Sequence, residues 1–344
     1  LIAVMYTDAV QGAIMLVGMT FLLIATYLLL GGVTVANTAL TNMADLVPVK
    51  LAEQGMNGWT VMPDLGSPIW YTVITTLVLG VGIGVLAQPQ LVVRFMTAKD
   101  NRSLNRAVLV GGPFILMMTG VAFTVGALTN VYFYQTQGKI AAQVATAGNI
   151  DTIIPIFINS AMPEWFVVLF MVTLLAAAMS TLSSQFHAMG TALICDVWGR
   201  GRECALSLRA NQAGVLAMIV ISVIIAFLMP GSIIAIATAM FMGLCASAFL
   251  PIFAVAVYCK RPDPLAAKAS LVIGALAWFI WAFFVNTKYA AVFGLSKALL
   301  GTVGVLAYPW SAIDPIVIAL PLSAITILSL QYLRGGCAPG AQTA

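Results

Sequence analysis

The chain has 344 residues, of which 62% are hydrophobic and only 8% are charged. Soluble domains carry about 25% charged residues, so this sequence lacks the polar side chains needed to cover a water-exposed surface. The low charge content, the small net charge of +4 and the five scattered cysteines also exclude a secreted disulfide scaffold, a nucleic-acid-binding protein and a disordered tail. The composition therefore predicts an all-α protein that crosses the lipid bilayer several times.

Eight segments are apolar enough to cross a bilayer as helices, for which about 20 residues are needed. Between them lie two long polar stretches, Val33–Pro68 and Tyr132–Glu164, and a shorter one, Asn286–Ser311. We expect residues 1–333 to form one transmembrane domain, followed by a short cytoplasmic tail, 334–344. The predicted spans are Ala9–Gly31, Ile69–Ala87, Ala107–Val131, Trp165–Cys195, Gln212–Met229, Ser232–Tyr258, Ala269–Val285 and Ala312–Leu333.

The distribution of positive charge predicts the orientation of these spans. Eleven of the fifteen Lys and Arg residues fall on one side of the membrane, and the other side holds only Lys50, Lys139, Lys288 and Lys297. Because Lys and Arg accumulate on the cytoplasmic side, we expect both chain ends in the cytoplasm and a location in the cell membrane. The chain starts at Leu1 rather than Met, so we expect it to begin inside a larger protein.

The fourth predicted span carries a run of small and hydroxyl residues, AAAMSTLSSQ, from Ala176 to Gln185. Ala177, Ser180, Thr181 and Ser184 share one helix face, with Ser183 at its edge. Hard cations such as Na⁺ prefer several oxygen ligands, so this face is a candidate sodium site near the middle of the bilayer. The alternative, that these small residues only let helices pack closely, remains open.

The second predicted span is interrupted in the stretch LGVGIGVLAQPQ, from Leu79 to Gln90. Gly80, Gly82 and Gly84 weaken the helix, and Pro89 removes an amide donor. A broken helix at membrane depth is tolerated where it lines a cavity, and its freed backbone groups can hold a solute or an ion. Gly80 and Gly84 also form a GxxxG pair, which is often only a packing face, and both interpretations stay open.

The first predicted span follows the motif TDAVQG, Thr7 to Gly12. A carboxylate within the membrane is a functional candidate by default, which makes Asp8 a possible ion ligand. Asp8 is also a possible helix N-cap at the cytoplasmic surface, because Ala9–Gly31 can span the bilayer without it. The only histidine, His187, is expected to be a buried hydrogen-bonding residue.

These stretches together resemble the sodium:solute symporter family, which includes sodium/proline, pantothenate and sugar symporters. The resemblance rests on TDAVQG (7–12), on GVGIGVLAQPQLVVRFMTAKDNRSLNRAV (80–108) and on LLAAAMSTLSSQ (174–185) with CDVW (195–198) after it. It implies a LeuT-type core of ten helices in two inverted repeats. The first six spans of this chain would be core helices five to ten, the last two would be accessory, and core helices one to four would precede this sequence.

The resemblance also implies roles for individual residues. Ala177 (through its carbonyl), Ser180 and Thr181 would form half of the principal sodium site. Asp8 with Ser183 and Ser184 would form a second sodium site on the inner side. Proline-type members carry aromatic residues where this chain has Val81 and Val85, so we expect a different solute pocket. The broken span that faces the substrate would comprise Gly80, Val81, Gly82, Gly84, Val85, Gln88 and Pro89.

We therefore predict a sodium-coupled symporter that moves a small organic solute by alternating access. The solute would be an amino acid such as proline, or a small carboxylate or pantothenate-like acid. One histidine and few carboxylates within the membrane exclude most enzyme mechanisms, so we expect no catalysis, no cofactor beyond Na⁺ as coupling ion and no nucleic-acid partner. The alternative is a transporter-like sensor domain of a signalling protein, and the oligomeric state stays open.

Overall fold

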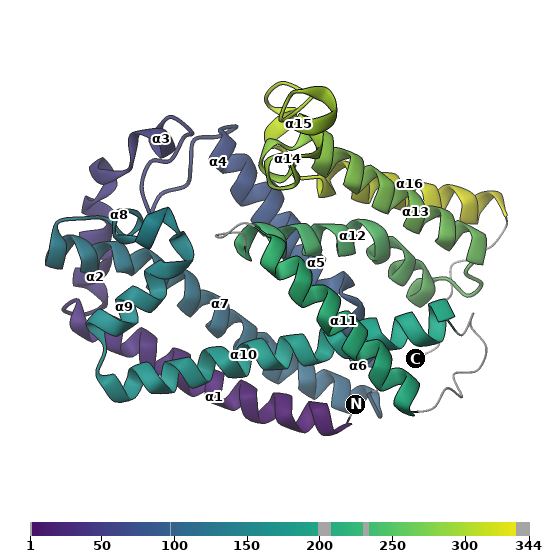
Figure 1. Cartoon of the computed structure of the whole chain (residues 1–344), viewed down its shortest axis with the longest axis horizontal. Helices are drawn as coiled ribbons and strands as arrows, with labels where there is room; N and C mark the ends of the chain where they lie inside the picture. Colours follow the sequence, from purple (N-terminus) through teal and green to yellow (C-terminus); the bar gives the residue numbers. More distant parts are fainter. Residues whose placement is uncertain (1, 97, 199–207, 230–233, 335–344) are drawn as a thin grey trace. The chain divides into compact units, whose positions relative to one another are not determined.

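The structure, a computed structural model, describes residues 2–96, 98–198, 208–229 and 234–334 (Figure 1). Most of the described residues are helical, and eight spans among them are long and apolar enough to cross a membrane, which confirms the predicted number. The tail predicted beyond Arg334 lies outside the described residues. The spans are α1 (Ile2–Leu29), the composite segment Pro68–Ala87, α7 (Asn101–Gln137), α10 (Glu164–Thr191, extended by η6, Ala192–Trp198), α11 (Leu208–Leu228), α12 (Ile234–Tyr258), α13 (Pro264–Ile280, extended by η7, Trp281–Val285) and α16 (Ile316–Leu333).

The helices divide into two compact units, each made from two separate parts of the chain. Residues within 1–46 and 97–232 form the first unit, and residues within 47–96 and 233–344 form the second. We describe each unit by itself. The single transmembrane domain expected for residues 1–333 stays a prediction.

The first unit is built around α1, α7 and α10, with α11 packed on α10 (Figure 1). The helix α2 (Val33–Asn42) and the short helices α8 (Ala141–Val144) and α9 (Ile153–Ala161) also belong to it. The core of this unit contains the large apolar side chains of Leu22, Val121, Val125, Phe133, Phe157, Phe166 and Phe170. Removal of these side chains from water drives the packing.

The second unit packs α12, α13 and α16 together, with the composite second span against α12 (Figure 1). Gly274 of α13 makes this packing close, because a Cβ there would overlap the backbone oxygen of Ser247 on α12. On the same helix, Ser270 Oγ lies 2.8 Å from Ser323 Oγ of α16. Small residues and interhelical hydrogen bonds of this kind are typical of helix packing in membranes. The short helices α3 (Val49–Ala52), α14 (Thr287–Phe293) and α15 (Leu295–Leu300) complete the unit.

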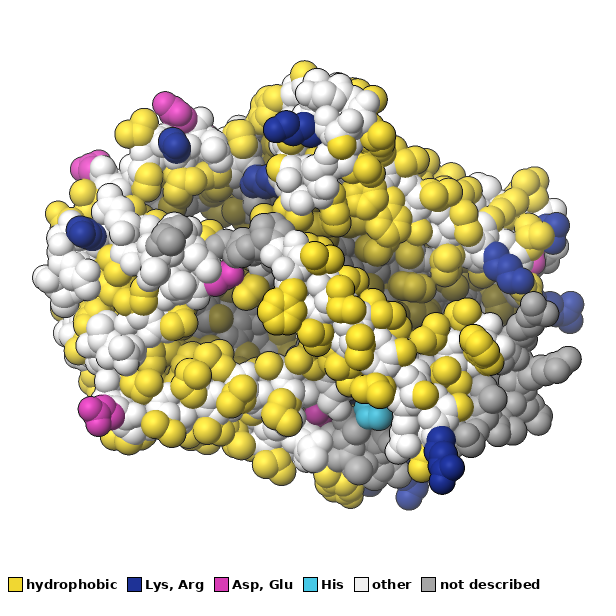
Figure 2. All heavy atoms as spheres, in the orientation of Figure 1, with side chains coloured by type: hydrophobic (Ala, Val, Ile, Leu, Met, Phe, Trp, Pro, Cys, Tyr) yellow, Lys and Arg dark blue, Asp and Glu magenta, His cyan; other side chains and the backbone are white. Residues whose placement is uncertain are grey.

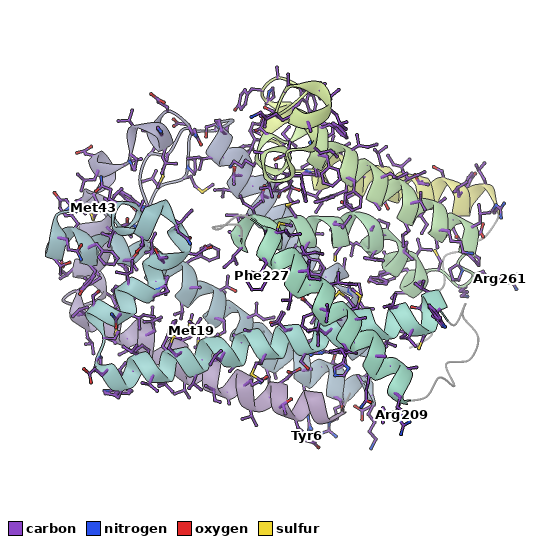
Figure 3. The ribbon with its side chains drawn as sticks, viewed as in Figure 1. Tyr6, Met19, Met43, Arg209, Phe227 and Arg261 are labelled. Carbon is purple, nitrogen blue, oxygen red and sulfur yellow. The ribbon has the colours of Figure 1, made fainter. Side chains whose placement is uncertain are left out.

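Hydrophobic side chains cover much of the outside of these helices, as Figure 2 shows. Leu109 and Leu116 of α7 expose 75% and 77% of their surface, and Phe227 of α11 exposes 87% and is labelled in Figure 3. Soluble proteins rarely expose contiguous apolar surface of this extent. The exposed residues therefore agree with helices that face lipid or further helices.

Several helices run past their predicted ends. The third span was predicted at 107–131, but α7 covers 37 residues because Asp100 caps its start and Gly138 ends it. The Asp100 carboxylate accepts a hydrogen bond from Ser103 N at 2.6 Å, and Gly138 has a positive φ of 65°. Polar residues at the ends of a helix do not contribute to an apolar pattern, so hydropathy finds only the membrane-spanning middle.

Candidate functional site

A close contact between α1 and α10 lies at Gly18 and Thr173, where a Cβ on the glycine would overlap Thr173 Oγ1. The two helices run in opposite directions (Figure 1). Gln11 precedes Gly18 by seven residues, and Ser180 follows Thr173 by seven. Seven residues are nearly two turns, so Gln11 and Ser180 return to the contact face at the same level. By the same count Asp8 is level with Ser183, on the edge of that face.

The hydroxyl groups of this face are not all used inside the helix. In membrane helices Ser and Thr commonly bond the carbonyl four residues before them, and Thr173 Oγ1 donates to Leu169 O in this way at 2.9 Å. Ser184 Oγ likewise donates to Ser180 O at 2.8 Å. By contrast, the hydroxyls of Ser180, Thr181 and Ser183 make no hydrogen bond to any described residue. Their oxygens are available to an ion or to water.

The acidic motif of α1 lies inside the helix rather than at its start. Because α1 begins at Ile2, Asp8 is not an N-cap, and that alternative is wrong. Asp8 is half-buried, and Gln11 lies one turn further along the helix. The Gln11 Oε1 atom is buried and has no hydrogen-bond partner among the described residues. A buried acceptor without a donor is unfavourable by about 1–3 kcal/mol, which a bound cation would offset.

Other residues of the predicted face are placed less favourably for an ion. Thr181 is exposed, whereas Ala177, Ser180, Ser183 and Ser184 are half-buried. The helix α10 continues unbroken past Ala177, so the Ala177 carbonyl belongs to the helical hydrogen-bond ladder and has only its second lone pair to offer. His187 is exposed, so the prediction of a buried hydrogen-bonding histidine is wrong.

The second span is interrupted, but its main break is not at the glycines. The segment starts as α4 (Pro68–Tyr71), continues as the π-helix η2 (Thr72–Val81) and tightens through α5 (Gly82–Gly84) and the 3₁₀ turn η3 (Val85–Ala87). Helical geometry ends at Gln88, whose ψ is 122°, and α6 (Pro89–Met96) follows. Proline restricts the residue before it to extended geometry, which explains the position of the break. π-Helical turns of this kind are frequent at functional sites.

The seven residues predicted to face a substrate lie on different sides of this segment. Gly84 packs on α12, where a Cβ would overlap the Met242 backbone, and Gly80 lies beside Asp314. Gln88 is buried, and its Nε2 contacts the Met242 sulfur. These three positions are therefore used for packing inside the second unit. Gly82 is exposed, and Val81, Val85 and Pro89 are half-buried.

No motif or hydrophobic pattern in the sequence indicates a function for Asp314, which precedes Pro315. Asp314 lies just before α16, and its Oδ1 accepts a hydrogen bond from Ile316 N at 3.0 Å. It is also fully buried, and its Oδ2 accepts from Tyr289 OH at 2.6 Å. The backbone N–H of Asp314 donates to Thr75 Oγ1 of η2 at 3.1 Å. These partners are far away along the chain, so no local pattern reveals them.

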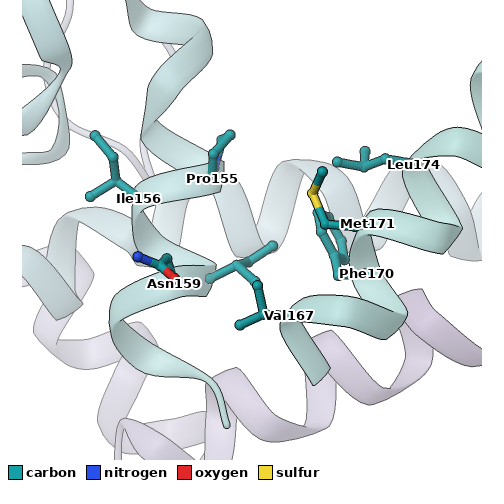
Figure 4. A pocket seen from close by; sticks show the side chains of 8 residues that line it. Pro155, Ile156, Asn159, Val167, Phe170, Met171 and Leu174 are labelled. Atoms are coloured by element: carbon teal, nitrogen blue, oxygen red, sulfur yellow. The ribbon is translucent and has the colours of Figure 1, made fainter. Parts of the chain in front are cut away.

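A mostly apolar pocket of about 370 Å³ lies between α9 and α10 (Figure 4). Val167, Phe170, Met171 and Leu174 line it from α10, and Asn159 of α9 is its main polar group. Leu174 precedes Ser180 by less than two helical turns, so pocket and hydroxyl face belong to the same helix. Nothing in the pocket lining indicates a particular ligand.

Eight apolar spans, an oxygen-bearing face on α10 and an irregular second span that ends at Gln88 define a multi-pass membrane protein. The family model of the sodium:solute symporter family matches residues 1–274. The chain therefore belongs to the sodium:solute symporter family.

Curated relatives agree with this assignment. The chain is 26% identical over 292 residues to the high-affinity proline transporter PutP of Bacillus subtilis, covering 82% of this chain and 55% of that protein. It is 26% identical over 279 residues to the sodium/pantothenate symporter of Haemophilus influenzae, covering 79% of this chain and 52% of that protein. The osmoregulated proline transporter OpuE of Bacillus subtilis is 26% identical over 303 residues, 87% of this chain and 56% of its own. The chain thus spans about half the length of the curated relatives that it matches.

Proposed function

We propose that this chain supplies the sodium-binding helix pair and the solute-facing broken span of a sodium-coupled symporter. Sodium would move down its gradient and carry a small organic solute with it by alternating access, with no covalent step. The observation that carries the proposal is the contact face of α1 and α10. There, the unbonded hydroxyl of Ser180 and the unpartnered Oε1 of Gln11 lie at the same level.

The principal sodium site would use Ser180, Thr181 and the carbonyl of Ala177. All three ligands are neutral, which suits a monovalent ion that must bind and leave within a transport cycle. The hydroxyls of Ser180 and Thr181 have no intrahelical bond to break before they coordinate the ion. The remaining ligands would come from outside this face.

A second sodium ion would bind near Asp8, Ser183 and Ser184. Asp8 would supply a carboxylate ligand within the span Tyr6–Leu29, where acidic residues are rare and are functional candidates by default. Asp8 and Ser183 lie at the same level of two helices that pack together. The Ser184 hydroxyl would have to leave Ser180 O to join them.

The solute would contact the open side of the broken span, at Val81, Gly82, Val85 and Pro89. Two valines give a smaller and less aromatic surface than the proline-type members have, so the solute need not be proline. An amino acid, a monocarboxylate or a pantothenate-like acid fits the family and the relatives named above. We further propose that both chain ends are cytoplasmic, on the basis of the Lys and Arg distribution. No observation favours the sensor alternative.

Uptake measurements on the full-length protein test this proposal. A screen of labelled solutes with and without sodium identifies the substrate, and sodium titrations then compare wild type with Ser180→Ala and Thr181→Ala. We expect the sodium half-saturation concentration to rise about tenfold in each variant, because a hydrogen-bond-like contact to a charge contributes about 1.5–3 kcal/mol. Thr119→Ala is the matched control, since its hydroxyl bonds only Ile115 O of its own helix. An unchanged half-saturation in both variants would refute the sodium site.

A further inference from the structure

The second unit contains a carboxyl group whose burial the proposed sodium and solute sites do not explain. Asp314 has no exposed surface, and no Lys, Arg or His among the described residues forms an ion pair with it. An isolated charge in such surroundings is strongly unfavourable, so a buried acid of this kind commonly binds a proton instead. Burial raises the pKa of Asp314, although the hydrogen bonds from Tyr289, Ile316 N and Thr76 act in the opposite direction.

The surroundings of Asp314 favour a proton over a metal ion. Tyr289 OH and Ile316 N both direct hydrogens at its oxygens. The Trp278 Nε1 atom of α13 is also near, because it and Asp314 Oδ1 lie 3.1 and 3.4 Å from the point where a Cβ of Gly243 would be. Trp278 is 2% exposed, and its Nε1 has no hydrogen-bond partner among the described residues. Hydrogen-bond donors repel a metal cation, whereas they can stabilise the anion left when an acid loses its proton.

Asp314 contacts the π-helical part of the second span through its backbone N–H and, by a hydrogen bond with Thr76, through its carboxyl group. Asp314 N bonds Thr75 Oγ1, and a Cβ on Gly80 would lie 3.8 Å from the Asp314 carboxyl carbon. A change of charge on Asp314 would therefore act directly on η2. The span that we propose to face the solute is the one that this carboxyl group touches.

We propose that Asp314 is a proton-binding site that is coupled to the π-helical half of the broken span. In the protonated state the neutral acid rests in its apolar surroundings. When the O–H bond breaks, the proton leaves to water and the electron pair stays on the carboxylate, which Tyr289 OH, Ile316 N and the unpartnered Trp278 Nε1–H then stabilise. This site is separate from the proposed sodium ligands, which belong to the first unit.

Few other titratable groups affect this site. Tyr289 contacts the carboxyl group directly, and burial raises the pKa of its phenol, so it remains a donor throughout the physiological range. Lys288 is its neighbour on α14, but its Nζ donates to Thr72 Oγ1 at 2.5 Å. The other titratable groups on the surrounding elements are Cys245 of α12, Tyr258 at the end of α12, Lys268 of α13 and Tyr332 of α16, and none of them bonds the carboxyl group.

Infrared difference spectroscopy tests the proposal without reference to transport. The full-length protein, purified in a detergent without ester groups, is titrated from acid to alkaline pH. We expect the carbonyl stretch of a protonated carboxylic acid to persist above the range in which an ordinary aspartate ionises, about pH 4. This band should be absent in Asp314→Asn. It should persist in the control variant Asp263→Asn, because the wild-type Asp263 carboxylate pairs with Arg334 at 3.3 Å.

A second variant keeps the test decisive if Asp314→Asn does not fold. Tyr289→Phe retains the acid but removes one donor to its anion, so the midpoint at which the band disappears should move to higher pH. The proposal would be overturned if the spectrum at neutral pH contained no carboxylic acid band that changes in Asp314→Asn or in Tyr289→Phe. Sodium-dependent uptake in the same preparation shows whether the proposed transport function stands independently.

Discussion

At the scale of single residues, the facing surfaces of α1 and α10 carry several polar atoms that have no hydrogen-bond partner among the described residues. Thr173 satisfies its hydroxyl within α10, but Ser180, Thr181 and Ser183 do not, and Gln11 buries an amide oxygen opposite them. Native proteins leave few buried polar atoms unsatisfied, and those that remain often belong to a binding site. The pattern favours an ion as the common partner of these oxygens.

Gln11→Met separates a binding role from a structural one. Met has nearly the same length but no buried acceptor, so we expect the free energy of unfolding to stay the same or to rise by about 1 kcal/mol. The sodium half-saturation of uptake should nevertheless increase several-fold. Gln331→Met is the control, because that amide bonds both Arg261 O and Asp263 N, and its loss should lower stability. A stabilised Gln11→Met protein with normal sodium dependence would show that Gln11 is not a ligand.

At the scale of elements, the broken span shows how much the sequence could predict. Its glycines and Pro89 correctly indicated an irregular segment, since composition alone shows a weak helix. The location of the break at Gln88, the π-helix before it and the use of Gly84 for packing depend on α12 and Asp314, which lie more than 150 residues away. Such long-range contacts leave no periodic signal in the segment itself.

Two glycines of this span make a matched pair for stability measurements. A Cβ at Gly84 would lie 2.6 Å from the backbone carbonyl carbon of Met242, whereas Gly82 is exposed and its nearest contact is 4.0 Å away. We expect Gly84→Ala to lower the free energy of unfolding of the purified protein by about 1–3 kcal/mol, because α12 must move away from the added methyl group. Gly82→Ala should be neutral or slightly stabilising, since alanine favours helix. Equal effects would mean that the span does not pack on α12 as described.

At the scale of the whole molecule, composition and hydropathy were sufficient to predict the number of spans and the class of protein. The eight spans are confirmed because lipid permits almost no alternative to a long apolar helix. The motifs at 7–12, 80–108 and 174–185 placed the chain in the family that the model over residues 1–274 also identifies. The two-unit organisation and the buried Asp314 cluster were not predictable, since both arise from pairings between distant segments.

Direct binding of radioactive sodium to the purified full-length protein tests the central claim most simply. Wild type should bind sodium saturably, and Ser180→Ala combined with Thr181→Ala should weaken that binding at least about tenfold, because two uncharged oxygen ligands are lost. Thr119→Ala should bind like wild type, and unfolding curves of all three proteins should coincide. Sodium binding that is equally tight in the double variant would contradict a site on this face of α10.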